Sequence, residues 1–100
     1  MASAQFTLPP EVQEDITRAA ALLKAEGCSE VYLFGSWTSA NATPESDIDL
    51  AVRGCPPARF FHLMGRLMSE LRHPVDLVML DRGDPFAAYL DQTGGLVRIA

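Results

Sequence analysis

The chain has 100 residues, of which 48% are hydrophobic and 21% are charged, and its formal net charge is −5. This length and composition are typical of one small globular domain and exclude a disordered chain. The acidic balance, without a basic cluster, disfavours binding to a nucleic-acid backbone and suits a basic protein partner.

The first regular element that the sequence predicts is a helix over residues 9–26. Prolines suit its first turn, Glu11, Glu14 and Asp15 complement its positive end, and Gly27 supplies a stop. We expect this helix to cover one face of a sheet. Its apolar residues recur at helical spacing and are Val12, Ile16, Ala19, Ala20 and Leu23.

A short apolar run over residues 31–34 predicts a buried strand, and Gly35-Ser36 ends it with a bend. Glycine lets the backbone approach a phosphate closely, and the Ser36 hydroxyl can donate a hydrogen bond to a phosphate oxygen. The polar segment 36–46 is expected to form one helical turn and then a loop. Trp37 in this segment suits hydrophobic packing better than nucleotide stacking or partner contact, because indoles are usually buried.

Two carboxylates open the next predicted strand, residues 46–52, whose apolar residues alternate with Asp47, Asp49 and Ala51. Positions i and i+2 of a strand lie about 6.5 Å apart and point the same way, which suits oxygen ligands of hard divalent cations. A pair of Mg²⁺ ions can bind a nucleotide's phosphates and activate an attacking hydroxyl. An isolated Asp-x-Asp is more often a solvated acidic face, but its combination with the Gly-Ser bend favours a nucleotide site.

An apolar stripe predicts a second helix over residues 57–72, and the stripe is either core or a partner-facing surface. His62 and His73 show no metal-ligand spacing, so we interpret both as structural. The stripe consists of Phe60, Phe61, Met64, Leu67, Met68 and Leu71.

Residues 74–80 form the third predicted strand, in which Asp76 is the single charge of an apolar run. An unpaired buried charge is unfavourable, so Asp76 is expected either at the exposed beginning of the strand or compensated by a metal. A turn follows, with Asp84 placed to cap a short helix that begins at Pro85. Residues 96–99 are expected to add an edge strand. The side chains of the short helix that should face the core are Phe86, Tyr89 and Leu90.

Cys28 and Cys55 are the only cysteines. A disulfide between them stays open at this point, but the absence of a secretory leader and of metal-ligand spacing favours reduced thiols in a cytosolic protein. No apolar stretch approaches the roughly 18 residues of a membrane span. We therefore expect one cytoplasmic domain over residues 1–100, with residues 1–8 flexible.

The segment from Phe34-Gly35-Ser36 to Asp47-Ile48-Asp49-Leu50 resembles the signature of the minimal nucleotidyltransferases, small members of the DNA polymerase β-like superfamily. The flanking helices and strands fit the same layout. The resemblance implies an α/β (α+β) fold: a small mixed β-sheet with helices packed mainly on one face and the acidic site open on the other. One departure is that residues 37–41 contain neither the Arg nor the Gly that many relatives carry there.

The resemblance also implies a site and a partner. Asp47, Asp49 and Asp76 would form a three-carboxylate Mg²⁺ site, with Asp76 as the base for the acceptor hydroxyl, and Gly35-Ser36 would bind the phosphates of a nucleoside triphosphate. Members of the family are often antitoxins paired with a HEPN-domain ribonuclease toxin. Active members neutralise the toxin by transferring AMP from ATP to a toxin tyrosine.

Two functions therefore agree with the sequence. The first is Mg²⁺-dependent transfer of AMP from ATP to a HEPN toxin. The second is a non-catalytic antitoxin that covers its partner through apolar helix faces. The Gly-Ser bend and the three aspartates favour the first, because a purely steric inhibitor needs no clustered charge.

Overall fold

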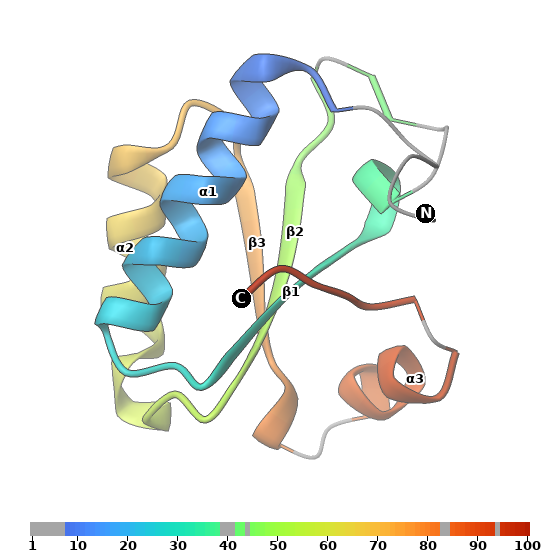
Figure 1. The fold of residues 1–100 in the computed structure, drawn as a ribbon. Coiled ribbons are helices and arrows are strands. Elements are labelled where there is room, and N and C mark those ends of the chain that lie inside the picture. Colours follow the sequence, from blue (N-terminus) through green and yellow to red (C-terminus); the bar gives the residue numbers. More distant parts are fainter. Residues whose placement is uncertain (1–7, 39–41, 44, 83–84, 94) are drawn as a thin grey trace.

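A four-stranded mixed sheet forms the centre of the protein, in the order β3-β2-β1-β4, and Figure 1 shows β1, β2 and β3 of this sheet. β1 pairs antiparallel with both β2 and β4, whereas β2 and β3 are parallel. The computed structural model describes residues 8–38, 42–43, 45–82, 85–93 and 95–100. The strands are β1 (Glu30–Phe34), β2 (Ile48–Arg53), β3 (Val75–Met79) and β4 (Val97–Arg98), so the expected edge strand is confirmed.

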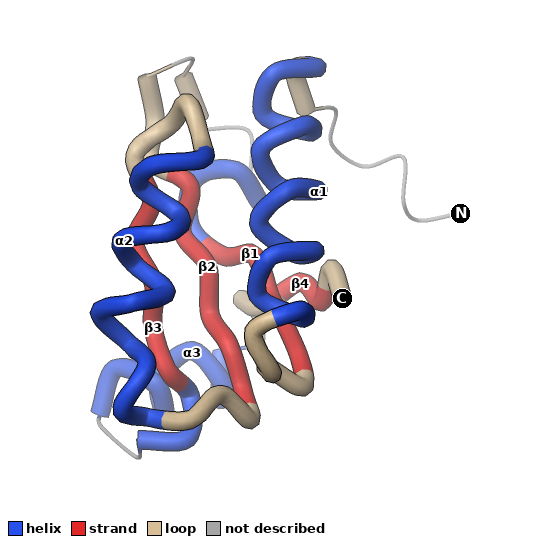
Figure 2. The backbone as a smooth tube through the Cα atoms, turned by 90° about the vertical axis from the view of Figure 1, so that its left-hand side faces the viewer, coloured by secondary structure: helices blue, strands red, loops and turns tan. Residues whose placement is uncertain are grey.

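Two helices cover one face of the sheet and a third lies on the other side. In Figure 1, α1 (Pro10–Ala25) and α2 (Phe60–Glu70) stand to the left of the strands, and α3 (Pro85–Thr93) to the right. The view turned by 90° places α1 and α2 in front of the sheet and α3 behind it (Figure 2). The expectation of helices mainly on one face is confirmed. Three short 3-10 helices complete the connections, η2 (Gly35–Thr38), η3 (Pro57–Arg59) and η4 (Leu80–Arg82).

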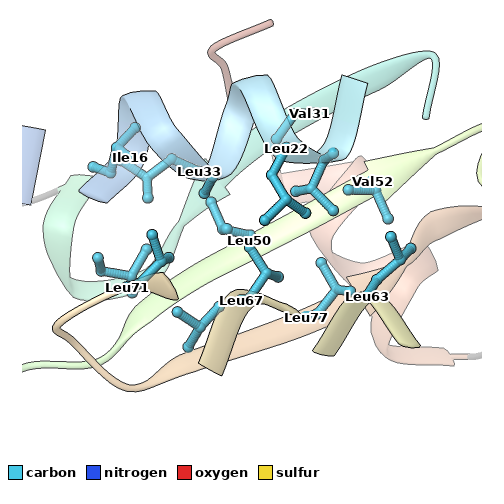
Figure 3. Close-up of a cluster of buried hydrophobic side chains, with 14 of the residues drawn as sticks. Ile16, Leu22, Val31, Leu33, Leu50, Val52, Leu63, Leu67, Leu71 and Leu77 are labelled. Carbon is cyan, nitrogen blue, oxygen red and sulfur yellow. The ribbon is translucent and has the colours of Figure 1, made fainter. Parts of the chain in front are cut away.

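The main core lies between the sheet and the helices α1 and α2. Every second residue of β2 points into it, and Ile48, Leu50 and Val52 are at most 1% exposed. Leucines and valines from α1, α2 and the strands interlock with them (Figure 3). Alternation along the strand therefore leaves the intervening residues, Asp49 among them, on the opposite face.

The apolar stripe of α2 divides between the core and the surface. Leu67 and Leu71 are buried, and so is Leu63, which lies outside the predicted stripe. Phe61 and Met68 are 84% and 66% exposed. The core reading is therefore confirmed for the buried members of the stripe, and a partner-facing role of Phe61 and Met68 stays a prediction.

A smaller apolar cluster fills the space between α3 and the sheet. The prediction that Tyr89 faces this core is wrong, because its side chain is 61% exposed. Phe86 faces the core only in part: its side chain is 49% exposed, but its ring meets that of Phe34 edge-on with centroids 6.0 Å apart. Phe86 and Tyr89 each directly precede a buried residue, and a shift of one position turns a helical side chain by about 100°. The buried residues of the cluster are Phe34, Ala51, Leu80, Ala87 and Leu90.

The interpretation of Cys28 and Cys55 as reduced thiols is wrong for this structure, which joins them in a disulfide. The antiparallel pairing of β1 with β2 sets Glu30 opposite Arg53. The residues just beyond this pair therefore lie side by side, with the two cysteine Cα atoms 4.2 Å apart. Cysteine count and spacing could not reveal this, because the partner depends on the strand register.

Some expectations fall on parts of the chain that the structure does not describe. The cap at Asp84 and the flexibility of residues 1–7 lie outside the described residues. Leu8 is described and packs against the main core. Within the described part of the chain, every helix is too short or too polar to cross a membrane.

Candidate functional site

The predicted acidic residues meet where β1 ends and where β2 and β3 begin. In the parallel pair of β2 and β3, Asp49 lies directly opposite Asp76. In the antiparallel pair of β1 and β2, Asp49 lies opposite Phe34, the residue before Gly35. Neighbouring strands are about 4.8 Å apart. Three segments that are distant in the sequence therefore meet around Asp49, on the face away from α1 and α2.

Gly35 approaches the Asp49 carboxylate so closely that a larger residue would displace it. Its φ is +78°, a conformation that side chains other than glycine rarely adopt. A Cβ at this position would overlap Oδ2 of Asp49 and lie 3.0 Å from its Cγ. Ser36 follows, half-buried, as the second residue of η2. The Gly-Ser bend thus lies beside the carboxylate, as a phosphate-binding turn next to a metal site requires.

Asp47 lies just before β2 rather than within it. The strand begins at Ile48, whose N–H donates to the carbonyl of Pro74, so pairing with the β3 segment starts there. The predicted strand start at residue 46 is wrong for this reason. The Asp47 side chain is exposed at the rim of the site.

The negative charges of Asp76 and Asp47 act on the half-buried carboxyl of Asp49. The pKa of Asp49 is raised to about 6, first by burial, then by the negative charge of Asp76, and then by that of Asp47. No cationic side chain is among these causes. Like charges gathered without a protein cation are the arrangement expected of a site for a divalent ion.

The donor set fits Mg²⁺ better than a softer metal. Asp47, Asp49 and Asp76 offer only oxygen atoms, the ligands of hard cations. Across the described residues, no three His, Cys, Asp or Glu side chains form a group that could by itself hold a metal ion. Mg²⁺ is usually bound through one or two carboxylates, with water and substrate phosphates completing its shell. Asp49 and Asp76 lie opposite each other and could supply such a partial set, but the structure does not gather Asp47 with them into the three-carboxylate group that the resemblance implies.

A buried network beside the site was not predicted from the sequence. The Asp15 side chain is 3% exposed, and its Oδ2 accepts hydrogen bonds from the backbone N–H groups of Arg72 and His73, both at 3.0 Å. The same oxygen lies 2.8 Å from Nδ1 of His73. The interpretation of His73 as structural is confirmed. Asp15 lies three residues after Val12 and four before Ala19, on the apolar side of the helix. This position could have indicated that its side chain is buried.

Trp37 extends this network towards the site. Its indole is 5% exposed, which confirms the packing role, and its ring meets the ring of His73 edge-on with centroids 6.5 Å apart. Its Nε1 donates a hydrogen bond of 3.2 Å to the carbonyl of Ser46. One side chain therefore connects the Gly-Ser turn with the residue before Asp47.

A known protein family and several solved structures share this fold. Residues 15–97 match the family model described as polymerase beta, nucleotidyltransferase. A search of curated proteins gives no match. The sequence expectation of a nucleotidyltransferase fold is confirmed.

Several solved toxin–antitoxin structures are similar to the chain. A crystal structure of the toxin–antitoxin MntA–HepT is 25% identical, with a TM-score of 0.62 over 86% of this chain and 69% of that one. A toxin–antitoxin structure with AMP-PNP is 26% identical, with a TM-score of 0.64 over 90% and 72% of the two chains. A tri-AMPylated Shewanella oneidensis HEPN toxin in complex with an MNT antitoxin is 25% identical, with a TM-score of 0.62 over 86% and 69%. With most of its length matched by the family model, the chain belongs to the polymerase β nucleotidyltransferase family.

Proposed function

We propose that the protein is a nucleotidyltransferase antitoxin that transfers AMP from ATP to a tyrosine hydroxyl of a HEPN toxin, in the presence of Mg²⁺, and so neutralises the toxin. The observation that carries the proposal is Asp49 opposite Asp76 beside Gly35, with the pKa of Asp49 raised to about 6 by burial and by its acidic neighbours. Similar structures that contain AMP-PNP or a tri-AMPylated HEPN toxin support an adenine nucleotide and a protein acceptor.

Each site residue has a distinct role in the proposed reaction. Asp49 and Asp76, with Asp47, would hold Mg²⁺, which when bound neutralises phosphate charge and activates the attacking hydroxyl. Gly35 lets the backbone approach the triphosphate, and Ser36 donates to a phosphate oxygen. Asp76 accepts the proton of the acceptor hydroxyl while that oxygen bonds to the α-phosphorus of ATP and pyrophosphate leaves.

The exposure of the site suits a large acceptor. Asp47 and Asp76 are exposed and Asp49 is half-buried. α1 and α2 lie on the far side of the sheet (Figure 2). A tyrosine on the surface of a folded protein can therefore approach Asp76 without a movement of the main core.

Mass spectrometry of the partner tests the proposal. The protein, ATP and Mg²⁺ are incubated with a candidate HEPN partner, and the mass of the partner is measured. We expect a gain of one or more AMP units that disappears in the double variant Asp47→Ala with Asp49→Ala. Glu45→Ala is the matched control, because Glu45 is an exposed acid of the same loop. A partner that is neutralised without a gain in mass would contradict the proposal.

A second function, neutralisation by steric covering, is favoured by one observation. Phe61 and Met68 expose large apolar side chains on α2, far from the acidic face. If this function is correct, the double aspartate variant still neutralises the partner, and Phe61→Ala with Met68→Ala does not. Loss of neutralisation in the aspartate variant alone would exclude it.

A further inference from the structure

The loops that build the site are tied together by one buried network. We define the Asp15–Trp37 network as Asp15, His73, Trp37 and the backbone carbonyl of Ser46. Its members come from α1, from the connection between α2 and β3, from η2, and from the segment before β2. Each of the last three segments contains a residue of the candidate site or lies within three residues of one.

The network begins at a carboxylate that the fold fully satisfies. Oδ2 of Asp15 receives the backbone N–H groups of Arg72 and His73 and faces Nδ1 of His73. A buried carboxylate is tolerated only when such partners compensate for lost hydration. Because Asp15 lies on α1, these hydrogen bonds hold the turn at His73 against α1. Asp76 follows three residues later, so the beginning of β3 is fixed with it.

The indole of Trp37 carries the connection to the other two segments. Its ring packs edge-on against the His73 ring, and its Nε1 donates to the carbonyl of Ser46. Trp37 lies two residues after Gly35, and Ser46 lies immediately before Asp47. A phenylalanine would fill most of the same space, but it has no N–H with which to hold Ser46 in one direction.

We propose that Trp37 is a positioning residue, anchored through His73 on Asp15, that sets the distance between the Gly-Ser bend and the aspartates. The inference rests on the proposed function for its role in turnover, but it also makes a claim about nucleotide binding alone. The network acts through the backbone of Ser46 and through η2, and it leaves proton transfer to the aspartates. Outer partners that orient a metal or phosphate site typically contribute about 10–100-fold to affinity or rate.

Two measurements on Trp37→Phe test the inference. The first is the affinity for ATP with Mg²⁺, measured by calorimetry, which we expect to fall about 10-fold or more. The second is AMP transfer to the partner, for which we expect a lower kcat with an unchanged KM for the partner. The matched control is Phe60→Leu, because Phe60 is a partly buried aromatic residue that packs against the same core. Thermal melts of both variants report any general loss of packing.

The outcomes separate failure of the inference from failure of the proposed function. If Trp37→Phe binds and turns over like Phe60→Leu, the indole serves packing alone and the inference is overturned. If the wild type binds ATP with Mg²⁺ but transfers no AMP, the proposed function fails. The inference is then decided by whether Trp37→Phe binds ATP about 10-fold more weakly than the wild type. If the wild type does not bind the nucleotide at all, both are overturned. Trp37 is the only tryptophan, so a change in intrinsic fluorescence on binding gives an independent signal from this position.

Discussion

The two faces of β2 follow opposite physical rules. Leu50 is fully buried between the sheet and the helices α1 and α2. Asp49, the preceding residue, lies opposite Asp76 on the other face, and its pKa is raised first by burial and then by the charges of Asp76 and Asp47. One face gains stability from burial, whereas the other keeps an unfavourable arrangement of charge. Local conflict of this kind is expected at functional sites, so the contrast separates residues that maintain the fold from the residues to which we assign a function.

The largest effect is expected from breaking the apolar face. Leu50→Ala leaves a cavity in the main core and should lower the free energy of unfolding by about 2–5 kcal/mol. Urea denaturation followed by circular dichroism measures this loss. A loss below about 1 kcal/mol would show that this face is not the principal source of stability.

The disulfide is expected to have the next largest effect. Cys28 precedes β1 and Cys55 follows β2, so the bond closes the end of the strand pair opposite to the acidic site. Reduction should lower the free energy of unfolding by about 2–4 kcal/mol. The bond itself is checked by alkylation of the native protein, in which both thiols should be protected until a reductant is added. Free thiols in the native, unreduced protein would contradict the expectation.

A pair of glycine substitutions isolates the close approach at the site. Gly27 and Gly35 both have positive φ, but a Cβ at Gly27 meets nothing within 4 Å, whereas one at Gly35 collides with Asp49. Gly27→Ala should cost about 1 kcal/mol from the backbone alone. Gly35→Ala should cost about 1–3 kcal/mol more and abolish nucleotide binding. Equal losses in thermal melts of the two variants would show that the contact with Asp49 is unimportant.

The smallest change in stability is expected from a substitution on the acidic face. Unlike the substitutions above, it should raise the free energy of unfolding. The folded-state pKa of Asp49 is raised from 3.8 to about 6, so the folded protein binds more protons than the unfolded chain between these values. Stability should therefore fall as pH rises from about 4 to 6 and stay lower above it. Asp49→Asn removes this penalty and should gain about 1 kcal/mol at pH 7.5 without divalent ions, a value reduced for partial exposure.

Thermal melts from pH 4 to 8, with a chelator present, measure the difference between wild type and Asp49→Asn. The two should converge at low pH and separate above pH 6. Adding Mg²⁺ at pH 7.5 should raise the melting temperature of the wild type more than that of the variant. A variant that is less stable than the wild type at pH 7.5 would contradict the expectation that the ionised Asp49 destabilises the folded protein.

Periodicity predicted most of the fold, because the main core is made by regular alternation. The strands at Leu50 and Leu77 and the helix at Leu23 follow directly from the spacing of apolar residues. Which side of a short helix faces the core is harder to predict. α3 buries Ala87, whereas the larger Phe86 and Tyr89 are 49% and 61% exposed. With only nine residues, its pattern does not single out one face.

The residues of the candidate site could be predicted from the sequence, but their geometry could not. The Gly-Ser bend and the aspartates predict a nucleotide site because of their combination, and that function stays a proposal. The register that sets Asp49 opposite Asp76, the burial of Asp15 and the pairing of Cys28 with Cys55 depend on tertiary contacts. Such contacts are set by the whole fold, and local sequence does not encode them.

The position of β3 after the crossover from β2 through α2 affects which strand of the sheet detaches first. β3 lies at the edge of the sheet, and Asp76 meets Asp49 only when that strand is docked. Repulsion between these two carboxylates therefore weakens the docking of β3 on the sheet. The repulsion disappears once β3 detaches. Amide protons of β3 should exchange with solvent sooner than those of β1, and a cation shared by the two carboxylates would slow that exchange.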